Sequence, residues 1–385
     1  MPPDRSSAAR DYFPSLTGLR AIAAGWVVLF HLWLLATAPV VRVFGLDLTP
    51  LFACGYLGVD LFFVLSGFLL GLPFLAWAQG LRPFPHLGRF WKRRCLRVLP
   101  AYFIQLATLI AVGWVLAGSP PIGLGKLLAY LSMEFVFVDG ISPLLNGVWW
   151  SLPVEWNFYI VLPLLALPFA RARWWLVALL VLAAVVAFRV FCYRLLIDGN
   201  RQVGFIGYPA ILQLPARLDQ FVCGMIGAWF HLRRDLSRGA NLRMAAAILA
   251  LGAFCWVLRG RGEVFLLPDT PWIFWHFTVV GALLGVIVHA AADEGRLSRV
   301  LFASRPLAFV GTISYSLYLW HNLVFQVALR SGFSQWTPVA GMAMLGLVLL
   351  PVVIAVSWLS YRLTERPFLV TAPAARGDRS ALAVD

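Results

Sequence analysis

The stretch YFPSLTGLRAIAAGWVVLFHLWLL, residues 12–35, is long and apolar enough to cross a membrane as one helix, yet it contains Arg20 and His31. At about 100° per residue, the two side chains lie about 20° apart around such a helix and about 16 Å apart along its axis. Arg20 could simply reach the membrane surface, but a histidine deep in a span usually lines a cavity or a proton pathway. The stretch therefore predicts a membrane helix with one polar stripe that serves a site.

The composition extends this interpretation to the whole chain. Of its 385 residues, 61% are hydrophobic and only 12% are charged, which excludes an ordinary soluble domain. A helix needs about 20 apolar residues to cross the hydrocarbon layer. We therefore predict an all-α, polytopic membrane bundle with ten spans, near residues 18–38, 55–76, 98–118, 149–169, 174–195, 214–232, 242–259, 271–291, 307–329 and 338–362.

One further apolar segment, residues 124–145, is interrupted by polar residues, glycine and proline. We predict a re-entrant or interfacial hairpin there, because these residues disfavour a continuous span. The membrane domain is expected to cover residues 18–369. It lies between a cytoplasmic N-terminal segment, residues 1–17, and a disordered cytoplasmic tail, residues 370–385.

The basic residues predict the orientation in the membrane. With the N-terminus inside, ten spans place most Lys and Arg residues in inner loops, as expected for a multi-pass protein of the bacterial inner membrane with both termini cytoplasmic. This topology accounts for most of the net charge of +14 without nucleic acid as a partner. The five cysteines are scattered, so we expect free thiols, and no spacing indicates a metal site or a permanently bound cofactor.

Four more ionisable residues reach the same outer depth as His31 when each span is followed in its predicted direction. They are Asp60, Glu155, Asp219 and His321, each on a different span. Because such residues are costly in a membrane, we interpret them as lining a shared polar cavity. The alternatives are that the two aspartates cap helix starts, that Glu155 lies at the interface, and that His321 only bonds a neighbouring helix.

A second cluster of charge lies in RPFPHLGRFWKRRCLRVLPAY, residues 82–102, which we predict to be a short loop that leads into the third span. Arginine can hold phosphate oxygens with two parallel hydrogen bonds, so Arg93, Arg94 and Arg97 are candidate phosphate ligands, together with Arg20 at the same inner level. The alternative is that these charges only set the topology and attract anionic lipid.

These stretches together resemble the acyltransferase-3 family of membrane proteins, which O-acylate sugars and other acceptors. The resemblance covers nearly the whole chain. Its motifs are Arg20 and His31 with ten residues between them, GYLGVDLFFVLSGFLL (55–70), FWKRRCLRVLPAY (90–102), WWSLPVEWNFY (149–159), ARLDQFVCGM (216–225), ISYSLYLWHN (313–322) and YRLTERPF (361–368).

The resemblance implies an acyl-CoA donor on the cytoplasmic face, with acetyl-CoA the first candidate, and transfer to a hydroxyl group, often on a cell-envelope glycan. It maps the family's key pair onto Arg20 and His31, and a further motif onto Trp150, Ser151 and Glu155. Some members carry an extra span and an extracytoplasmic hydrolase-like domain, and we expect neither here, because this chain resembles a stand-alone form. The chain is thus expected to recognise its acceptor itself or with glycan-assembly partners.

The mechanism that we expect has His31 as general base, with Glu155 or Asp60 orienting the imidazole or the acceptor. Trp150, Ser151, Asp219 and His321 would line the acceptor side. A covalent route through Ser66 or His31 is the rival. Two other classes stay open, a glycan or proton-coupled transporter and a catalytically silent scaffold, although no paired broken helices of the kind found in transporters are evident.

Overall fold

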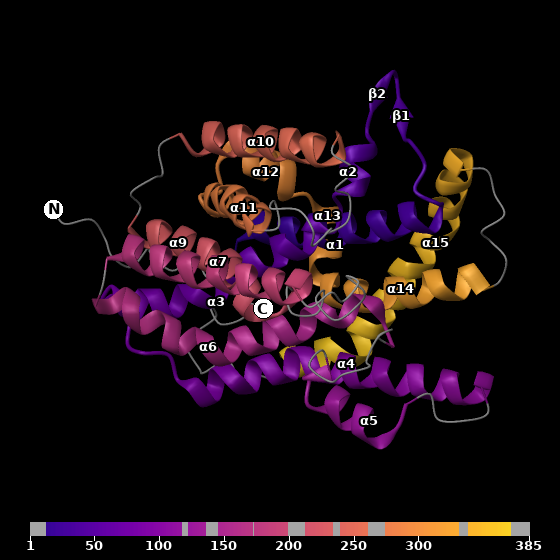
Figure 1. Ribbon diagram of the computed structural model, residues 1–385, viewed down its shortest axis with the longest axis horizontal. Helices are drawn as coiled ribbons and strands as arrows, with labels where there is room; N and C mark the ends of the chain where they lie inside the picture. The colour runs from indigo at the N-terminus through magenta and orange to yellow at the C-terminus, as the bar shows by residue number, and fades with distance from the viewer. Residues whose placement is uncertain are drawn as a thin grey trace.

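The computed structural model describes residues 13–117, 122–135, 145–171, 173–198, 212–233, 239–260, 274–330 and 338–370. Within these ranges the chain is helical apart from short loops and one small two-stranded sheet, which confirms the predicted all-α class. Most of the long helices run side by side, as expected for a membrane bundle (Figure 1).

The long helices cover the predicted spans, and the ninth span, 307–329, divides into α13 and α14. These long helices are α1 (Pro14–Leu35), α3 (Leu57–Ala78), α4 (Leu87–Ala117), α6 (Ser151–Arg171), α7 (Trp174–Asp198), α9 (Leu214–Arg233), α10 (Ala240–Gly260), α11 (His276–Ala292), α14 (Ser314–Arg330) and α15 (Pro338–Ser360). The short elements are β1 (Arg42–Val43), β2 (Leu46–Asp47), α2 (Thr49–Ala53), α5 (Leu124–Leu131), the 3-10 turn η3 (Gly147–Trp150), α12 (Arg296–Phe302), α13 (Arg305–Thr312), the π-helical turn η6 (Tyr361–Glu365) and α16 (Arg366–Val370).

Seven helices of the described chain are long and apolar enough to cross a membrane, and the bent pair α11 and α12 would make eight. The sequence predicted ten spans. The two remaining predicted spans, over α9 and α14, are helical but fall outside this set. Helix α14 has only 17 residues, and α9 contains Arg217, Asp219 and Gln220, which lower its hydropathy. Both helices also bury polar side chains in the bundle, such as Gln220 of α9 and His321 of α14.

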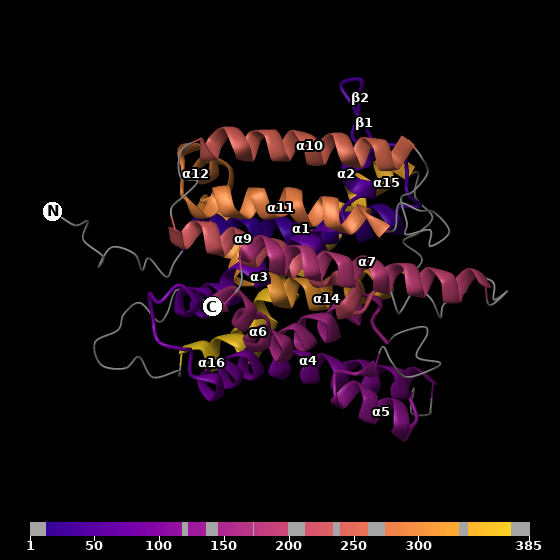
Figure 2. The same ribbon diagram turned by 60° about the vertical axis from the view of Figure 1, so that its left-hand side comes forward.

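Close backbone contact joins α3 to α9. A Cβ atom at Gly67 would collide with the backbone of Phe221, and one at Gly224 would collide with the backbone of Val64. Small residues allow membrane helices to approach this closely, so these two glycines fix the register of α3 against α9. Helix α1, which carries Arg20 and His31, packs against α3, α11, α13 and α14 and so lies in the interior of the bundle (Figures 1 and 2).

The structure differs from the expectations in helix α4 and after α1, and it describes only part of the predicted hairpin 124–145. Helix α4 begins at Leu87, so the basic segment is helical from that residue onward and only residues 82–86 are non-helical. Of the predicted hairpin 124–145, α5 is a helix of eight residues, too short to span a bilayer, and residues 136–144 lie outside the described chain. The antiparallel pair β1 and β2 follows α1 and was not expected.

The predicted ends of the membrane domain are only partly described. Helix α1 starts at Pro14, within the segment assigned to the N-terminal region, and α16 ends at Val370. Residues 1–12 and 371–385, which include most of both predicted terminal segments, lie outside the described chain.

Candidate functional site

A pocket with about 830 Å³ of atom-free space, including its open mouth, lies between α1, α3, α4, α6 and α14. Its polar lining residues are Arg20, Ser66, Arg94, Arg97, Ser151, Glu155, Tyr159, Ser314, Tyr315 and Tyr318. Apolar residues of α3, from Val59 to Leu70, complete the wall. An apolar cleft with a few convergent polar groups is the usual form of a small-molecule site.

Three arginines meet at one part of this pocket, which we call the arginine end. Arg20 comes from α1, and Arg94 and Arg97 come from α4, where they lie three residues apart and therefore near one face of the helix. Arg93 is half-buried on the same helix but does not line the pocket. The structure thus brings together three of the four arginines that the sequence proposed for donor binding.

A serine and a glutamate from different helices meet in the wall. Ser66 of α3 donates a hydrogen bond to Oε1 of Glu155 on α6, at 2.7 Å. The Oγ of Ser151, at the start of α6, lies 2.7 Å from the hydroxyl of Tyr318, which donates to the carbonyl oxygen of Val148. These contacts therefore hold a carboxylate and three of the pocket's hydroxyl groups in place on facing helices.

The two predicted histidines lie against each other. His31 Nδ1 is 3.4 Å from Nε2 of His321, and the ring centroids are 5.0 Å apart. His31 Nδ1 is also 2.9 Å from the carbonyl oxygen of Val27, and His321 Nδ1 is 3.1 Å from that of Leu317. A carbonyl oxygen only accepts, so in the neutral state both Nδ1 atoms carry the proton. This assignment leaves the lone pair of His31 on Nε2, as a general base requires.

Tyr318 connects the pocket to the histidine pair. It lines the pocket and lies three residues before His321 on α14, with its ring centroid 6.0 Å from that of His321. Three residues of helix rise about 4.5 Å, so the pair lies about one turn beyond the pocket wall. We call this side the histidine end. On helix α1, Arg20 therefore lies at the arginine end and His31 at the histidine end.

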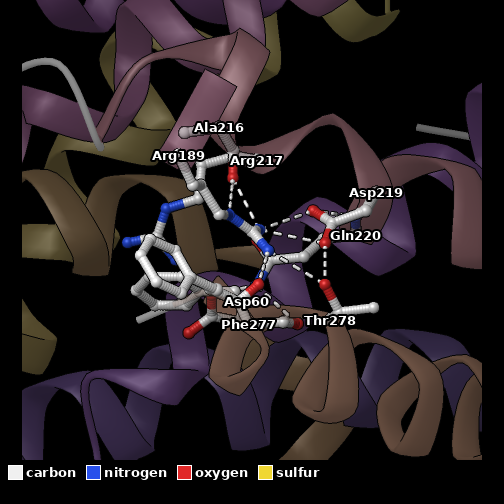
Figure 3. Close-up of polar contacts among 9 residues, drawn as sticks. Asp60, Arg189, Ala216, Arg217, Asp219, Gln220, Phe277 and Thr278 are labelled. Atoms are coloured by element: carbon white, nitrogen blue, oxygen red, sulfur yellow. Dashed lines mark hydrogen bonds and ion pairs between the residues drawn. The ribbon is translucent and has the colours of Figure 1, made fainter. Parts of the chain in front are cut away.

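Asp60 and Asp219 lie in a separate buried ion-pair cluster, shown in Figure 3. Asp60 accepts from Arg217 at 2.9 Å and from Nε2 of Gln220. Asp219 accepts from Arg189 of α7, with 2.9 and 3.0 Å to its two oxygens. Because each aspartate has an arginine partner, the desolvation of the charges is offset within the cluster. Neither aspartate lines the pocket.

Trp150 lies between this cluster and the pocket. The guanidinium of Arg217 lies 5.5 Å from its ring centroid, and the ring of Phe63 packs against it edge to face, with centroids 6.2 Å apart. The ring does not line the pocket, whereas the next residue, Ser151, does. The ion-pair cluster therefore contacts the segment in which α6 begins.

Sequence reasoning missed several residues of this region. Tyr315 and Tyr318 line the pocket, and Tyr315 bonds the carbonyl oxygen of Val98 at 2.9 Å. Glu365 is fully buried and accepts a hydrogen bond from Ser316. The signal was present in the stretches ISYSLYLWHN and YRLTERPF, where polar residues recur in apolar surroundings. No group of three or more potential metal ligands occurs among the described residues.

Comparison with known proteins identifies the domain. Residues 13–362 match the model of a family described as an acyltransferase domain. The chain is 31% identical to the "Putative membrane-bound transacylase BcsY" of Komagataeibacter xylinus, over 98% of this chain and 90% of the relative. It is 25% identical to the O-acetyltransferase OatA of Staphylococcus aureus, over 80% of this chain but only half of OatA. No solved structure matches the chain.

Proposed function

Because the chain belongs to the acyltransferase-3 family and is a membrane-bound acyltransferase, we propose that it transfers an acyl group from acyl-CoA to a hydroxyl group of a cell-envelope or secreted glycan. The observation that carries this proposal is the pocket that joins three arginines to a half-buried carboxylate, with the histidine pair about one turn beyond. The name of OatA favours acetyl as the acyl group. The protein would lie in the inner membrane with both termini in the cytoplasm.

The donor would bind with its phosphates at the arginine end. Arg20, Arg94 and Arg97 offer charge-assisted hydrogen bonds to phosphate oxygens, which are about twice as strong as neutral ones. The pantetheine arm would follow the apolar wall of α3 toward the histidine end. The separation of Arg20 and His31 along α1, about 16 Å, suits a long, thin ligand of this kind.

The chemical step that we propose is direct transfer. His31 Nε2 removes the proton of the acceptor hydroxyl while its oxygen attacks the thioester carbonyl carbon. The new C–O bond forms, the C–S bond breaks, and the leaving thiolate of CoA takes the proton from the imidazolium. General base catalysis contributes about 10²- to 10⁴-fold, so alignment of the two substrates in the pocket must supply much of the remaining acceleration.

The carboxylate that would assist this step is Glu155. It lies in the pocket wall, whereas Asp60 has Arg217 and Gln220 as partners outside it. We therefore propose Glu155 as the group that orients the acceptor, and we assign Asp60 and Asp219 to the support of α3 and α9. We likewise assign Trp150 a structural role, in which it would support the start of α6.

A covalent route is the second candidate for the mechanism, because Ser66 donates to Glu155 at 2.7 Å. A carboxylate in this position could accept the serine proton while Oγ attacks the thioester. The acyl group would then pass from Ser66 to the acceptor hydroxyl in a second step. An acyl adduct on the intact protein, formed with acyl-CoA in the absence of acceptor, would favour this route.

Purified protein in lipid nanodiscs tests the proposed function. It is incubated with acetyl-CoA and mixed envelope glycans, and mass spectrometry follows the acceptors. We expect an acetyl mass shift with the wild type, none with His31→Ala, and weaker CoA binding by Arg20→Ala. The exposed residues His86 and Arg296 supply matched controls, His86→Ala and Arg296→Ala. A wild type that binds no acyl-CoA would favour the transporter or the scaffold.

A further inference from the structure

The end of the pocket that faces the histidine pair carries two aromatic rings. Phe62 of α3 and Tyr318 of α14 both line the pocket, and their rings meet edge to face, with centroids 6.2 Å apart and planes at 73°. The ring of His321 follows Tyr318 at 6.0 Å, and neither His321 nor His31 lines the pocket. The two aromatic rings therefore stand between the pocket and the proposed base.

Helix packing gives an independent position for Phe62 along the pocket. A Cβ atom at Gly55, just before α3, would collide with Cβ of Phe30, and one at Gly58 would collide with the carbonyl oxygen of Ala23. Helices α1 and α3 therefore run antiparallel, and Phe62 lies one turn beyond Gly58, toward the arginine end. Because helical side chains lean toward the N-terminus of their own helix, the Phe62 ring points back toward the histidine end.

The Tyr318 side of this end is held in place. The hydroxyl of Tyr318 donates to the carbonyl oxygen of Val148 and lies 2.7 Å from Oγ of Ser151, at the start of α6. The side chain is only 6% exposed. Moving the ring would break two buried hydrogen bonds, and a buried polar group without a partner is costly. Tyr318 therefore gives the end of the pocket one fixed side.

The Phe62 side is held by packing alone, because a phenyl ring has no polar group to anchor it. Phe62 is half-buried and packs against the two larger buried apolar clusters of the described chain. Protein interiors are close-packed, so this ring fills volume that a smaller side chain would leave open. The size of the side chain at position 62 therefore determines the depth of the pocket at its histidine end.

We propose that Phe62 is a specificity-determining residue that limits the acyl group of the donor to a short chain such as acetyl. This inference rests on the proposed function, because it takes the pocket as the donor site, with the phosphates at the arginine end. A donor bound in this direction brings its thioester to the far end of the pocket, where the alkyl part of the acyl group meets the Phe62 ring. Each added methylene must then displace the ring or move the thioester away from the base.

The test is a competition between acetyl-CoA and butyryl-CoA at equal concentration, with full-length protein in nanodiscs and mixed envelope glycans as acceptors. Mass spectrometry counts the acetyl and butyryl groups on the acceptors at low conversion, which gives the ratio of the two kcat/KM values. One methylene in a hydrophobic pocket changes such a ratio by about 10- to 200-fold. We expect the wild type to prefer acetyl by at least about 100-fold, and Phe62→Ala to lower this preference at least about tenfold.

Phe62→Trp tests the direction of the effect. The indole fills at least the volume of the phenyl ring, so we expect the preference for acetyl to stay at least as high as in the wild type. A substitution that only disturbed the packing would lower the preference in Phe62→Trp as well as in Phe62→Ala. The exposed Phe191 of α7, which lies outside the pocket, supplies the matched control Phe191→Ala, with an unchanged preference expected.

The affinity for free CoA separates acyl selectivity from donor binding as a whole. Free CoA has no acyl group, so calorimetry should give Phe62→Ala a dissociation constant within about threefold of the wild type. Phe62→Leu is a milder change that should lower the preference for acetyl about threefold. It decides the question if Phe62→Ala does not fold.

An unchanged preference in the folded Phe62→Ala and Phe62→Leu proteins would overturn the inference. A lower preference in Phe62→Trp, or a wild type that transfers butyryl as readily as acetyl, would overturn it too. A wild type that transfers neither group would contradict the proposed function itself, so the two failures can be told apart.

Discussion

The Nδ1 atom of His31 lies 3.4 Å from Nε2 of His321, although the two residues are 290 positions apart in the chain. Each ring also faces the carbonyl oxygen of the residue four positions earlier in its own helix. These contacts fix the tautomers of both rings and leave a lone pair on His31 Nε2. The base of the proposed reaction is therefore held by a second histidine, where many catalytic histidines have a carboxylate.

Replacement of His321 tests this relationship. In His321→Ala, His31 Nδ1 loses one of its two acceptors, so the ring can rotate or change tautomer. We expect kcat to fall about 10- to 100-fold, less than the loss for removal of the base itself, with unchanged affinity for CoA. Steady-state kinetics together with calorimetry measures both values. A rise in the dissociation constant of CoA with normal kcat would instead place His321 in donor binding.

The Ser66–Glu155 contact distinguishes the two chemical routes. Under direct transfer, Ser66→Ala removes one hydrogen bond to Glu155 and should keep the rate within about tenfold. Glu155→Gln should cost more, because the acceptor loses the carboxylate that orients it. Initial rates of acyl transfer are compared, and intact-protein mass spectrometry searches for an acyl adduct. Complete loss of transfer in Ser66→Ala, with an adduct on the wild type, would establish the covalent route.

The arginines of α4 should differ in their contribution to donor binding. Arg94 and Arg97 line the pocket, whereas Arg93 does not. We expect Arg94→Ala and Arg97→Ala to weaken CoA binding by about 10- to 100-fold, since hydrogen bonds to charged groups contribute about 1.5–3 kcal/mol. Arg93→Ala should change it by less than about threefold. Equal losses in all three variants would mean that the basic segment attracts the donor by its total charge.

The ion-pair cluster around Asp60 should affect stability more than donor binding. Breaking a buried pair leaves an uncompensated charge, so Asp60→Asn and Arg217→Ala should lower the free energy of unfolding by about 3–5 kcal/mol. Thermal unfolding in detergent measures this loss. The control is Asp293→Asn, whose partly exposed partner His231 lies at 3.4 Å and should contribute about 1 kcal/mol or less. A stable Asp60→Asn protein without activity would restore Asp60 to the catalytic step.

The sequence predicted the positions of the helices better than the contacts that their side chains make with other helices. Length and hydropathy located the spans because each depends only on consecutive residues, and the spacing of Arg20 and His31 placed both on one face of α1. The same reasoning gave similar depths for Asp60 and Glu155 without showing where their side chains point. In the structure Glu155 faces the pocket, while Asp60 meets Arg217 of α9, which is 157 positions away.

Other differences between the prediction and the structure arise because helices that are far apart in the chain contact one another. Close packing at Gly67 and Gly224 sets the register of α3 and α9, and no pattern within either helix reveals that register. The burial of Glu365 likewise depends on a π-helical turn, which shifts the following residues around the helix axis. The basic segment was predicted as a loop because its charges interrupt the apolar pattern, but a helix can extend beyond the hydrocarbon layer.

The measurement that tests the account most directly is the release of CoA thiol during acyl transfer by purified protein in nanodiscs, with wild type and His31→Ala compared at equal CoA occupancy. The account predicts glycan-dependent thiol release by the wild type and at least about a 100-fold slower rate for His31→Ala, with unchanged binding of CoA. Normal transfer by His31→Ala would contradict the assignment of the base and, with it, the proposed mechanism.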